Sequence, residues 1–186
     1  RTLEAHTNLV DQLQKRDIKR EYQAIVCGQL TSGGSIENKM GRHPKQRIKM
    51  AVTNNGKIAI THYRIIKKYQ HYTHLHVQLE TGRTHQIRVH MKYIGHTLFN
   101  DERYGGERIL KGTTFSKYKQ FVENCFKVLP RQALHARTLG FKHPVSGEMM
   151  RFEAPIPEDM EQCLHKCEHH KQHMGQCIQL CTNNQW

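Results

Sequence analysis

Apolar and polar residues alternate one by one over residues 75–79, which is the pattern of a strand with one buried face. Beyond this stretch the spacing changes, because Ile87, Met91 and Ile94 follow one another at steps of four and three, as on one face of a helix. The pattern predicts a strand, then a turn, then a helix that begins near Thr84, with Thr84 as its N-cap.

The same two periods predict further elements along the chain. Helices are expected over residues 4–16, with an inner face of Leu9, Val10 and Leu13, and over residues 116–126. Strands are expected over residues 21–30, 50–52, 57–66, 135–141 and 148–154, with turn-forming residues at 31–34, 54–56 and 143–147. Strands outnumber helices and short turns join them, so the expected fold class is α+β, a largely antiparallel mixed sheet with flanking helices.

The turn before the helix is rich in cationic side chains. Gly82 breaks the strand, Arg83 lies beside the unpaired N–H groups of the helix start, and Arg88 lies one turn into the helix. Guanidinium groups hold carboxylate or phosphate through paired hydrogen bonds, so the junction is a candidate anion site. An ordinary amphipathic helix end, with arginines that only contact solvent, is the competing interpretation, and the pattern leaves both open.

The overall charge favours nucleic acid as the partner. The 186 residues include 29 Lys and Arg against 16 Asp and Glu, for a formal net charge of +13. The basic segment 42–49 is the expected contact with RNA phosphates, and a merely solvated loop is the alternative. Its candidate RNA-binding residues are Arg42, Lys45, Arg47 and Lys49.

No apolar run is long enough to cross a bilayer, and the first residues have no signal-peptide pattern. We therefore expect a cytoplasmic protein. The chain starts without Met, directly before an amphipathic helix, and we expect it to be a piece of a longer protein.

Six cysteines fall into two groups. Cys27 and Cys125 stand alone in apolar surroundings, where a small buried thiol is expected. The other four lie in a His-rich tail of residues 163–186, and they are Cys163, Cys167, Cys177 and Cys181. Three residues separate the members of each pair, where a zinc knuckle has two, so we expect a solvated, partly frayed helix without metal. A metal-binding interaction element is the alternative.

Several segments, in a fixed order, carry a resemblance to a known family. The longest is Glu80-Thr81-Gly82-Arg83-Thr84-His85-Gln86-Ile87-Arg88-Val89-His90-Met91. The others are residues 19–22, 42–44, 61–64, Asp101 before 104–106, 134–136, 143–144 and 154–157. Over residues 1–162 the chain resembles the RluA family of pseudouridine synthases.

The resemblance implies a function, a domain and a partner. The family isomerises uridine in RNA: the bond from ribose to the base N1 is broken and the base is rejoined through C5, without cofactor or metal. The base must leave its stack to be reached. Residues 1–162 would be the C-terminal part of the catalytic domain, residues 163–186 a Cys/His-rich tail, and large-subunit ribosomal RNA the partner.

The resemblance also implies roles for single residues. Arg88 would pair with the family's essential aspartate, and Tyr22 would stack on the target base with its hydroxyl near the C5 proton. Without the resemblance, a strand tyrosine that packs on the sheet is the simpler interpretation of Tyr22. The pocket would be lined by Ile87 and Leu134, and the RNA backbone would be held by Arg83 and His85.

The family's essential aspartate lies in a His-Arg-Leu-Asp segment. This chain has four aspartates, none in that context, and they are Asp11, Asp17, Asp101 and Asp159. We therefore expect the nucleophile upstream of Arg1, an inactive isolated chain and an exposed strand edge where the missing piece would join. A non-catalytic RNA-binding module is the alternative.

Overall fold

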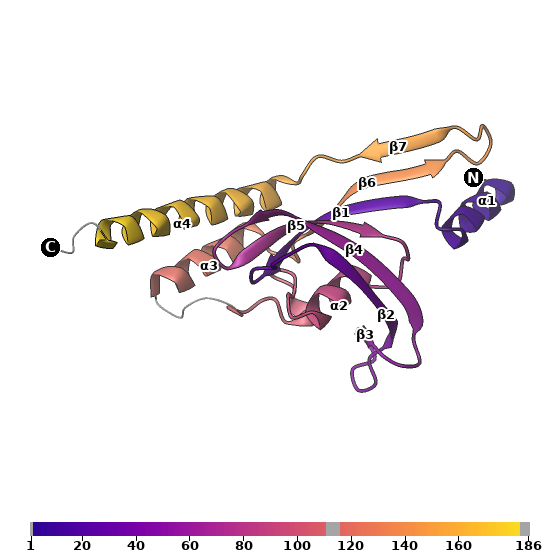
Figure 1. Ribbon diagram of the computed structural model, residues 1–186. Coiled ribbons are helices and arrows are strands. Elements are labelled where there is room, and N and C mark those ends of the chain that lie inside the picture. Colours follow the sequence, from indigo (N-terminus) through magenta and orange to yellow (C-terminus); the bar gives the residue numbers. More distant parts are fainter. Residues whose placement is uncertain (1, 111–115, 183–186) are drawn as a thin grey trace.

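A computed structural model describes residues 2–110 and 116–182, without the side chains of residues 171–182. Its centre is one seven-stranded antiparallel sheet (Figure 1). Across the sheet, the strands are β3 (Met50–Val52), β2 (Gly34–Arg42), β4 (Lys57–Lys68), β5 (Tyr72–Leu79), β1 (Lys19–Cys27), β6 (Leu134–Lys142) and β7 (Met149–Glu153). The helices are α1 (Leu3–Gln14), α2 (Gln86–Tyr93), α3 (Ser116–Val128), α4 (Glu158–Thr182) and a 3-10 turn, η1 (Glu102–Tyr104). The expected α+β class is confirmed.

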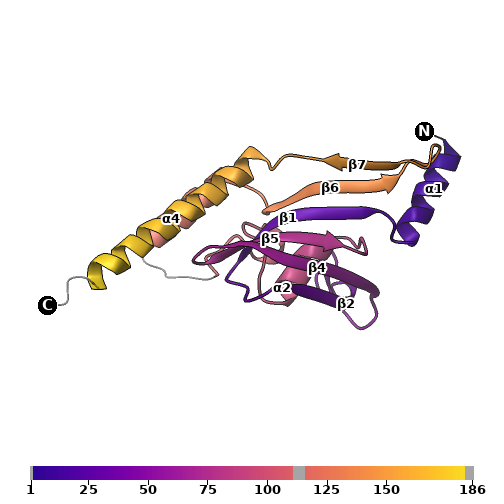
Figure 2. The ribbon, with the colours of Figure 1, turned by 45° about the horizontal axis from the view of Figure 1, so that its top comes forward.

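The helices lie at different parts of the sheet. Helix α2 lies against one face, α1 lies at one end, and α3 and α4 lie together at the other end (Figures 1 and 2). The chain termini are accordingly at opposite ends of the molecule. The short strands β3 and β7 form the two edges of the sheet.

Strand β1 supplies both halves of the core because its side chains alternate between the two faces. Ala24 and Val26 belong to the cluster that packs against α2 through Ile87 and Met91. Ile25 belongs instead to the cluster formed with α3 and α4. The second half of β1, where these residues lie, is thus buried on both of its faces.

Strand β2 is the element that the sequence pattern misses. Only Ile36 and Met40 of this strand are buried, and the residues between them are largely polar. The strand forms because it pairs with β3 on one side and β4 on the other. Backbone hydrogen bonds to these neighbours define it, and no clear alternation of apolar residues is needed.

Helix α1 is present as expected, but of its predicted inner face only Leu9 is half-buried. Val10 and Leu13 are exposed, at 36% and 46%. The buried residue is Gln12, whose Nε2 donates to the carbonyl of Lys142 at 2.7 Å and whose Oε1 accepts from the N–H of Lys142 at 2.9 Å. A polar clamp to the end of β6, rather than an apolar stripe, therefore attaches this helix.

Helix α4 is also present, but its first part is not a solvated helix. Met160, Cys163 and Cys167 are buried against α3, so this face of the helix belongs to the core. The chain runs through residues 162 and 163 without a break in the helix, and the proposed domain boundary there stays a prediction. The side chains of Cys177 and Cys181 lie outside the described part.

In the described residues, no helix has the length and apolar character that a membrane crossing requires.

Two buried histidines give a pH prediction. His74 bonds to Gln23 and His90 to Thr61, and burial lowers the pKa of each to about 4 from an ordinary 6.5. The folded chain then binds fewer protons than the unfolded chain between these pH values. Stability should be intact above pH 6.5 and fall as the pH drops toward 4, by up to about 1.4 kcal/mol per pH unit for each histidine.

Urea denaturation at pH 7 and pH 5 measures this loss. A His90→Gln variant should lose less stability over that range than the parent chain, whereas the exposed His6→Gln control should lose as much. An unfolding free energy that is the same at both pH values would contradict the assignment.

Candidate active site and RNA interface

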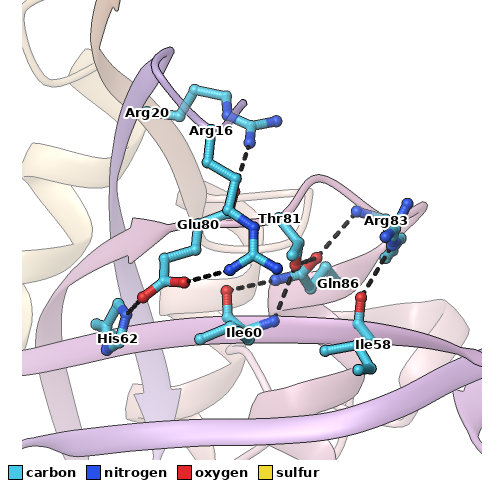
Figure 3. Close-up of polar contacts among 9 residues, drawn as sticks. All are labelled: Arg16, Arg20, Ile58, Ile60, His62, Glu80, Thr81, Arg83 and Gln86. Carbon is cyan, nitrogen blue, oxygen red and sulfur yellow. Dashed lines mark hydrogen bonds and ion pairs between the residues drawn. The ribbon is translucent and has the colours of Figure 1, made fainter. Parts of the chain in front are cut away.

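The buried amide of Gln86 organises the turn between β5 and α2 (Figure 3). Its Oε1 accepts from the hydroxyl of Thr81 at 2.8 Å and from the N–H of Arg83 at 2.9 Å. Its Nε2 donates to the carbonyl of Ile60 and to the hydroxyl of Thr61, both at 2.9 Å. The side chain is 2% exposed, so these four bonds satisfy it and fix the turn to β4.

This network explains why the helix starts later than the sequence predicts. The first helical residue is Gln86, and the N-cap is His85 with a left-handed backbone, φ 55°. Thr84 is therefore not the N-cap. The side chain of Gln86 reaches back to the N–H of Arg83 and holds the turn before the helix, and no side chain caps the helix N-terminus itself among the described residues.

On one side of the turn, Glu80 lies between two basic side chains (Figure 3). Its carboxylate is 3.0 Å from Nη1 of Arg16 and 2.6 Å from Nε2 of His62. The hydrogen bond from His62, followed by the charge of Arg16, lowers the pKa of Glu80. These two contacts of Glu80 link the end of β5 to β4 and to the segment after α1.

Arginines surround a hollow of about 430 Å³ on this side, and its lining includes Arg16, Arg20 and Arg83. Nε of Arg20 is buried and has no hydrogen-bond partner in the described residues. Nε of Arg83 donates to the carbonyl of Ile58 at 3.1 Å, although the residue is exposed. Three guanidinium groups against the single carboxylate of Glu80 leave this hollow positively charged.

On the other side of the turn, Arg88 holds a carboxylate within the chain. Its Nε and Nη2 donate to the two oxygens of Asp101 at 2.8 and 2.7 Å. Asp101 is fully buried, and it also accepts from the N–H of Tyr104. The guanidinium lies 4.9 Å from the ring centroid of Tyr104. Arg88 thus has a carboxylate partner within the chain that the sequence pattern does not identify, because the loop after α2 returns Asp101 to it; its pairing with the family's essential aspartate stays a prediction.

His85 joins the same group of residues. Its Nδ1 is 2.8 Å from the hydroxyl of Tyr104, which accepts from the N–H of Met50. Burial, together with the nearby charge of Arg88, lowers the pKa of His85. The lowered pKa favours the neutral ring, in which one ring nitrogen donates a hydrogen bond and the other accepts one.

A cleft of about 660 Å³ lies over these residues. Its lining includes Arg88, His85, Arg131 and Gln132. Arg131 is itself held by two bonds of 2.8 Å to Asp159 at the start of α4. The cleft is therefore lined by two arginines that carboxylates hold in place, and its lining also includes Arg103, Glu102 and Glu107.

The three residues expected at the base pocket all belong to one apolar cluster or pack against it, and their role as a pocket stays a prediction. Tyr22 and Leu134 are half-buried and pack against the cluster that contains Ile87. Tyr22 also borders a hollow beside Ala136, its partner in the β1–β6 pairing. By contrast, Arg83 and His85 line different hollows, so the structure does not place them as a pair.

The basic loop is ordered by its own hydrogen bonds. Nη1 of Arg42 donates to the carbonyl of Arg47, and Nδ1 of His43 accepts from the N–H of Lys45. Arg42, Lys45 and Arg47 are exposed. Lys49 borders a hollow of about 350 Å³ that Lys92 of α2 also lines, so the loop adds its charge beside α2.

Comparison with known proteins decides the family. A family model described as "RNA pseudouridylate synthase" matches residues 1–93, which are half of the chain. The chain belongs to this family. The match includes the whole Gly-Arg-Thr-His-Gln-Ile-Arg junction, and the expected RluA-family membership is confirmed.

Curated relatives agree. "Ribosomal large subunit pseudouridine synthase D" of Pseudomonas aeruginosa is 50% identical over 159 residues, which are 86% of this chain and 48% of that protein. The protein of the same name from Vibrio cholerae is 50% identical over 161 residues, with the same coverage. The chain thus spans about half the length of these relatives.

A solved structure confirms the fold. "Human RNA Pseudouridylate Synthase Domain Containing 1" superposes with a TM-score of 0.65, covering 87% of this chain and 65% of that one. At 21% identity this match shows the architecture alone.

The turn gives a stability prediction. Gln86→Ala should destabilise the chain by about 2–4 kcal/mol, because it leaves several buried polar groups of β4 and the turn without partners. Urea denaturation measures the change, and the exposed Gln120→Ala on α3 is the matched control. A Gln86→Ala chain as stable as this control would contradict the network.

Proposed function

We propose that the whole protein is an RNA pseudouridine synthase that isomerises uridine in large-subunit ribosomal RNA. The observation that carries the proposal is the position of Arg88, fixed by Asp101 at the border of a cleft, in a chain of this family. The names of the relatives support the substrate class. The expected cytoplasmic location is part of this proposal.

The catalytic aspartate belongs, in this proposal, to a segment that the chain does not contain. Asp101 is not a substitute, because it is fully buried and both of its oxygens are bound to Arg88. Asp159 is likewise bound to Arg131. In this proposal Arg88 uses Nε and Nη2 to hold Asp101 and turns its remaining edge to the cleft, where an incoming carboxylate would be kept ionised.

The target base would enter next to Tyr22. Ile87 and Leu134 supply the apolar surface against which an extruded uracil ring packs, and Tyr22 supplies a ring for stacking and a hydroxyl. These residues bind and orient the base, while the missing carboxylate would carry the covalent chemistry.

RNA phosphates would follow the cations on both sides of α2. The basic loop and Lys92 lie on one side, and the hollow of Arg16, Arg20 and Arg83 on the other. His85 contributes a hydrogen-bond donor rather than a charge, because its pKa is lowered. Phosphate contacts of this kind fix the register of the RNA without reading its sequence.

A non-catalytic RNA-binding module is the second candidate function. The same basic surface would serve it. Asp101 and Asp159 are already paired with arginines within the chain, which agrees with a module that carries out no chemistry of its own. The gene segment before Arg1 discriminates the two candidates: a His-Arg-Leu-Asp sequence there supports the enzyme, and its absence removes that proposal.

The role of Arg88 is tested in the full-length protein. Arg88→Ala should lower the rate of pseudouridine formation on large-subunit ribosomal RNA by about 100-fold or more, because the carboxylate loses a positioned cation. Arg108→Ala, at an exposed arginine that pairs with Glu107 in the described part of the chain, should leave the rate unchanged.

Removal of Arg88 also leaves Asp101 buried without its partner, which costs about 3–5 kcal/mol. Thermal unfolding is therefore followed for each variant, and Arg88→Lys is included because it keeps the charge but not the paired hydrogen bonds. Full activity in a folded Arg88→Ala protein would overturn the role.

The phosphate contacts are tested by the salt dependence of RNA binding. Replacement of Arg42, Lys45 and Arg47 together by Ala should make RNA binding less sensitive to salt. The negative slope of the logarithm of the association constant against the logarithm of the salt concentration should become shallower, by about 0.7–0.9 for each phosphate that the basic loop no longer neutralises. The control replaces three lysines of α3, Lys117, Lys119 and Lys127, which removes the same charge elsewhere. Equal slopes for the two triple variants would show that the basic loop is only a solvated loop.

A further inference from the structure

Three cysteine side chains converge between α3 and α4. Cys125 comes from α3, and Cys163 and Cys167 come from α4. Their Sγ atoms all lie within 4.8 Å of one another. The expectation that Cys125 stands alone is therefore wrong, because α4 folds back along α3 and brings two further thiols to it.

The cluster is enclosed. Cys125, Cys163 and Cys167 are 1%, 0% and 4% exposed. They belong to the apolar core at this end of the molecule, together with Val122, Leu129 and Met160. Water is thus largely excluded from the three sulfur atoms.

The arrangement suits a metal ion in its geometry. Cys163 and Cys167 are four residues apart on one helix and lie on the same face, so a single ion can meet both together with Cys125. Thiolates bound to one ion at about 2.3 Å lie roughly 4 Å from one another. Small side-chain rotations would bring the present sulfur positions to that spacing.

The thiols already act on one another. Cys125 forms hydrogen bonds with both Cys163 and Cys167, so the three side chains contact one another directly.

Simple packing is the competing explanation, because buried cysteine behaves as a small apolar residue. It accounts for the burial of each cysteine separately. It does not account for three sulfur atoms that converge from two helices.

We propose that Cys125, Cys163 and Cys167 form a three-thiolate site for a thiophilic d10 cation, Zn²⁺ or Cu⁺, which joins α4 to α3. Binding forms three metal–sulfur bonds and releases the protons of the thiols that are protonated beforehand. Cu⁺ is satisfied by soft sulfur ligands alone, whereas Zn²⁺ would take a fourth ligand from outside the set. The site is additional to the proposed synthase function and shares no residue with the lining of the cleft at Arg88.

The test uses the full 186-residue chain, reduced and freed of metal, and titrated without oxygen with Zn²⁺ in one arm and Cu⁺ in the other. Native mass spectrometry counts the bound ions, and thermal unfolding follows stability. One ion bound per cluster, with a rise in Tm of about 5 °C or more, is the expected result for the ion that the site takes.

Matched variants separate this cluster from the other thiols. Cys177→Ala with Cys181→Ala removes the two tail cysteines and should keep the ion and the rise in Tm. Cys125→Ala with Cys163→Ala and Cys167→Ala should lose both. Cys27→Ala, at another buried cysteine, controls for a general effect of thiol removal, and Cys125→Ala alone should weaken binding at least tenfold if the triple variant fails to fold.

Three results would overturn the proposal. They are equal ion uptake by the parent chain and a folded triple or single Cys125 variant, no uptake of either ion by the parent chain, and loss of uptake only in the tail variant. A fourth result would assign the cluster to redox chemistry instead. It is a disulfide between Cys125 and either Cys163 or Cys167, in a protein that binds neither ion once the disulfide has been reduced.

Discussion

The structure depends most on the buried amide of Gln86. A strand that ends and a helix that begins on the next turn leave several backbone groups without partners, and this site has no Ser, Thr, Asp or Asn at the N-cap to satisfy them. The side chain of Gln86 instead holds this junction in place through bonds to the turn and to β4. The start of α2 is therefore fixed to the centre of the sheet.

That attachment sets where the arginines of the junction lie. Arg83, before the helix, is directed to the hollow beside Glu80, and Arg88, one turn later, is directed to the cleft on the other side. One short motif thus serves two surfaces. The two sites also differ in character, since Glu80 is partly exposed and shared by two bases, whereas Asp101 is fully buried and bound to one arginine through both oxygens. Buried paired bonds hold a guanidinium more firmly than an exposed ion pair does.

The sequence predicts those elements whose side chains alternate or recur with a clear period. The strands of residues 72–79 and 57–68, and helix α3, are predictable in this way, because their apolar faces meet the core. Strand β2 is not, because its backbone partners, rather than its side chains, define it. The start of α2 escapes prediction because the turn before it is held by the bonds of Gln86 to β4, and no local pattern indicates a bond to a strand more than twenty residues away.

The same limit applies to the site. Residue types and the family resemblance identify Arg88, Tyr22, Ile87 and Leu134, and the structure gathers the last three in one cluster. Asp101 as the partner of Arg88, and Cys125 as the neighbour of Cys163, depend on how loops and helices return in space. Such contacts have no signature in spacing along the chain.

We propose above all that this chain holds the binding and positioning half of a uridine isomerisation site, whose reactive carboxylate belongs to another segment of the protein. The most direct measurement is the pseudouridine content of large-subunit ribosomal RNA after incubation with the full-length protein and, separately, with residues 1–186 alone. The account predicts pseudouridine with the full-length protein and none with the isolated chain, even when that chain is folded and binds the RNA. Pseudouridine formed by the isolated chain, or none formed by the full-length protein, would contradict it.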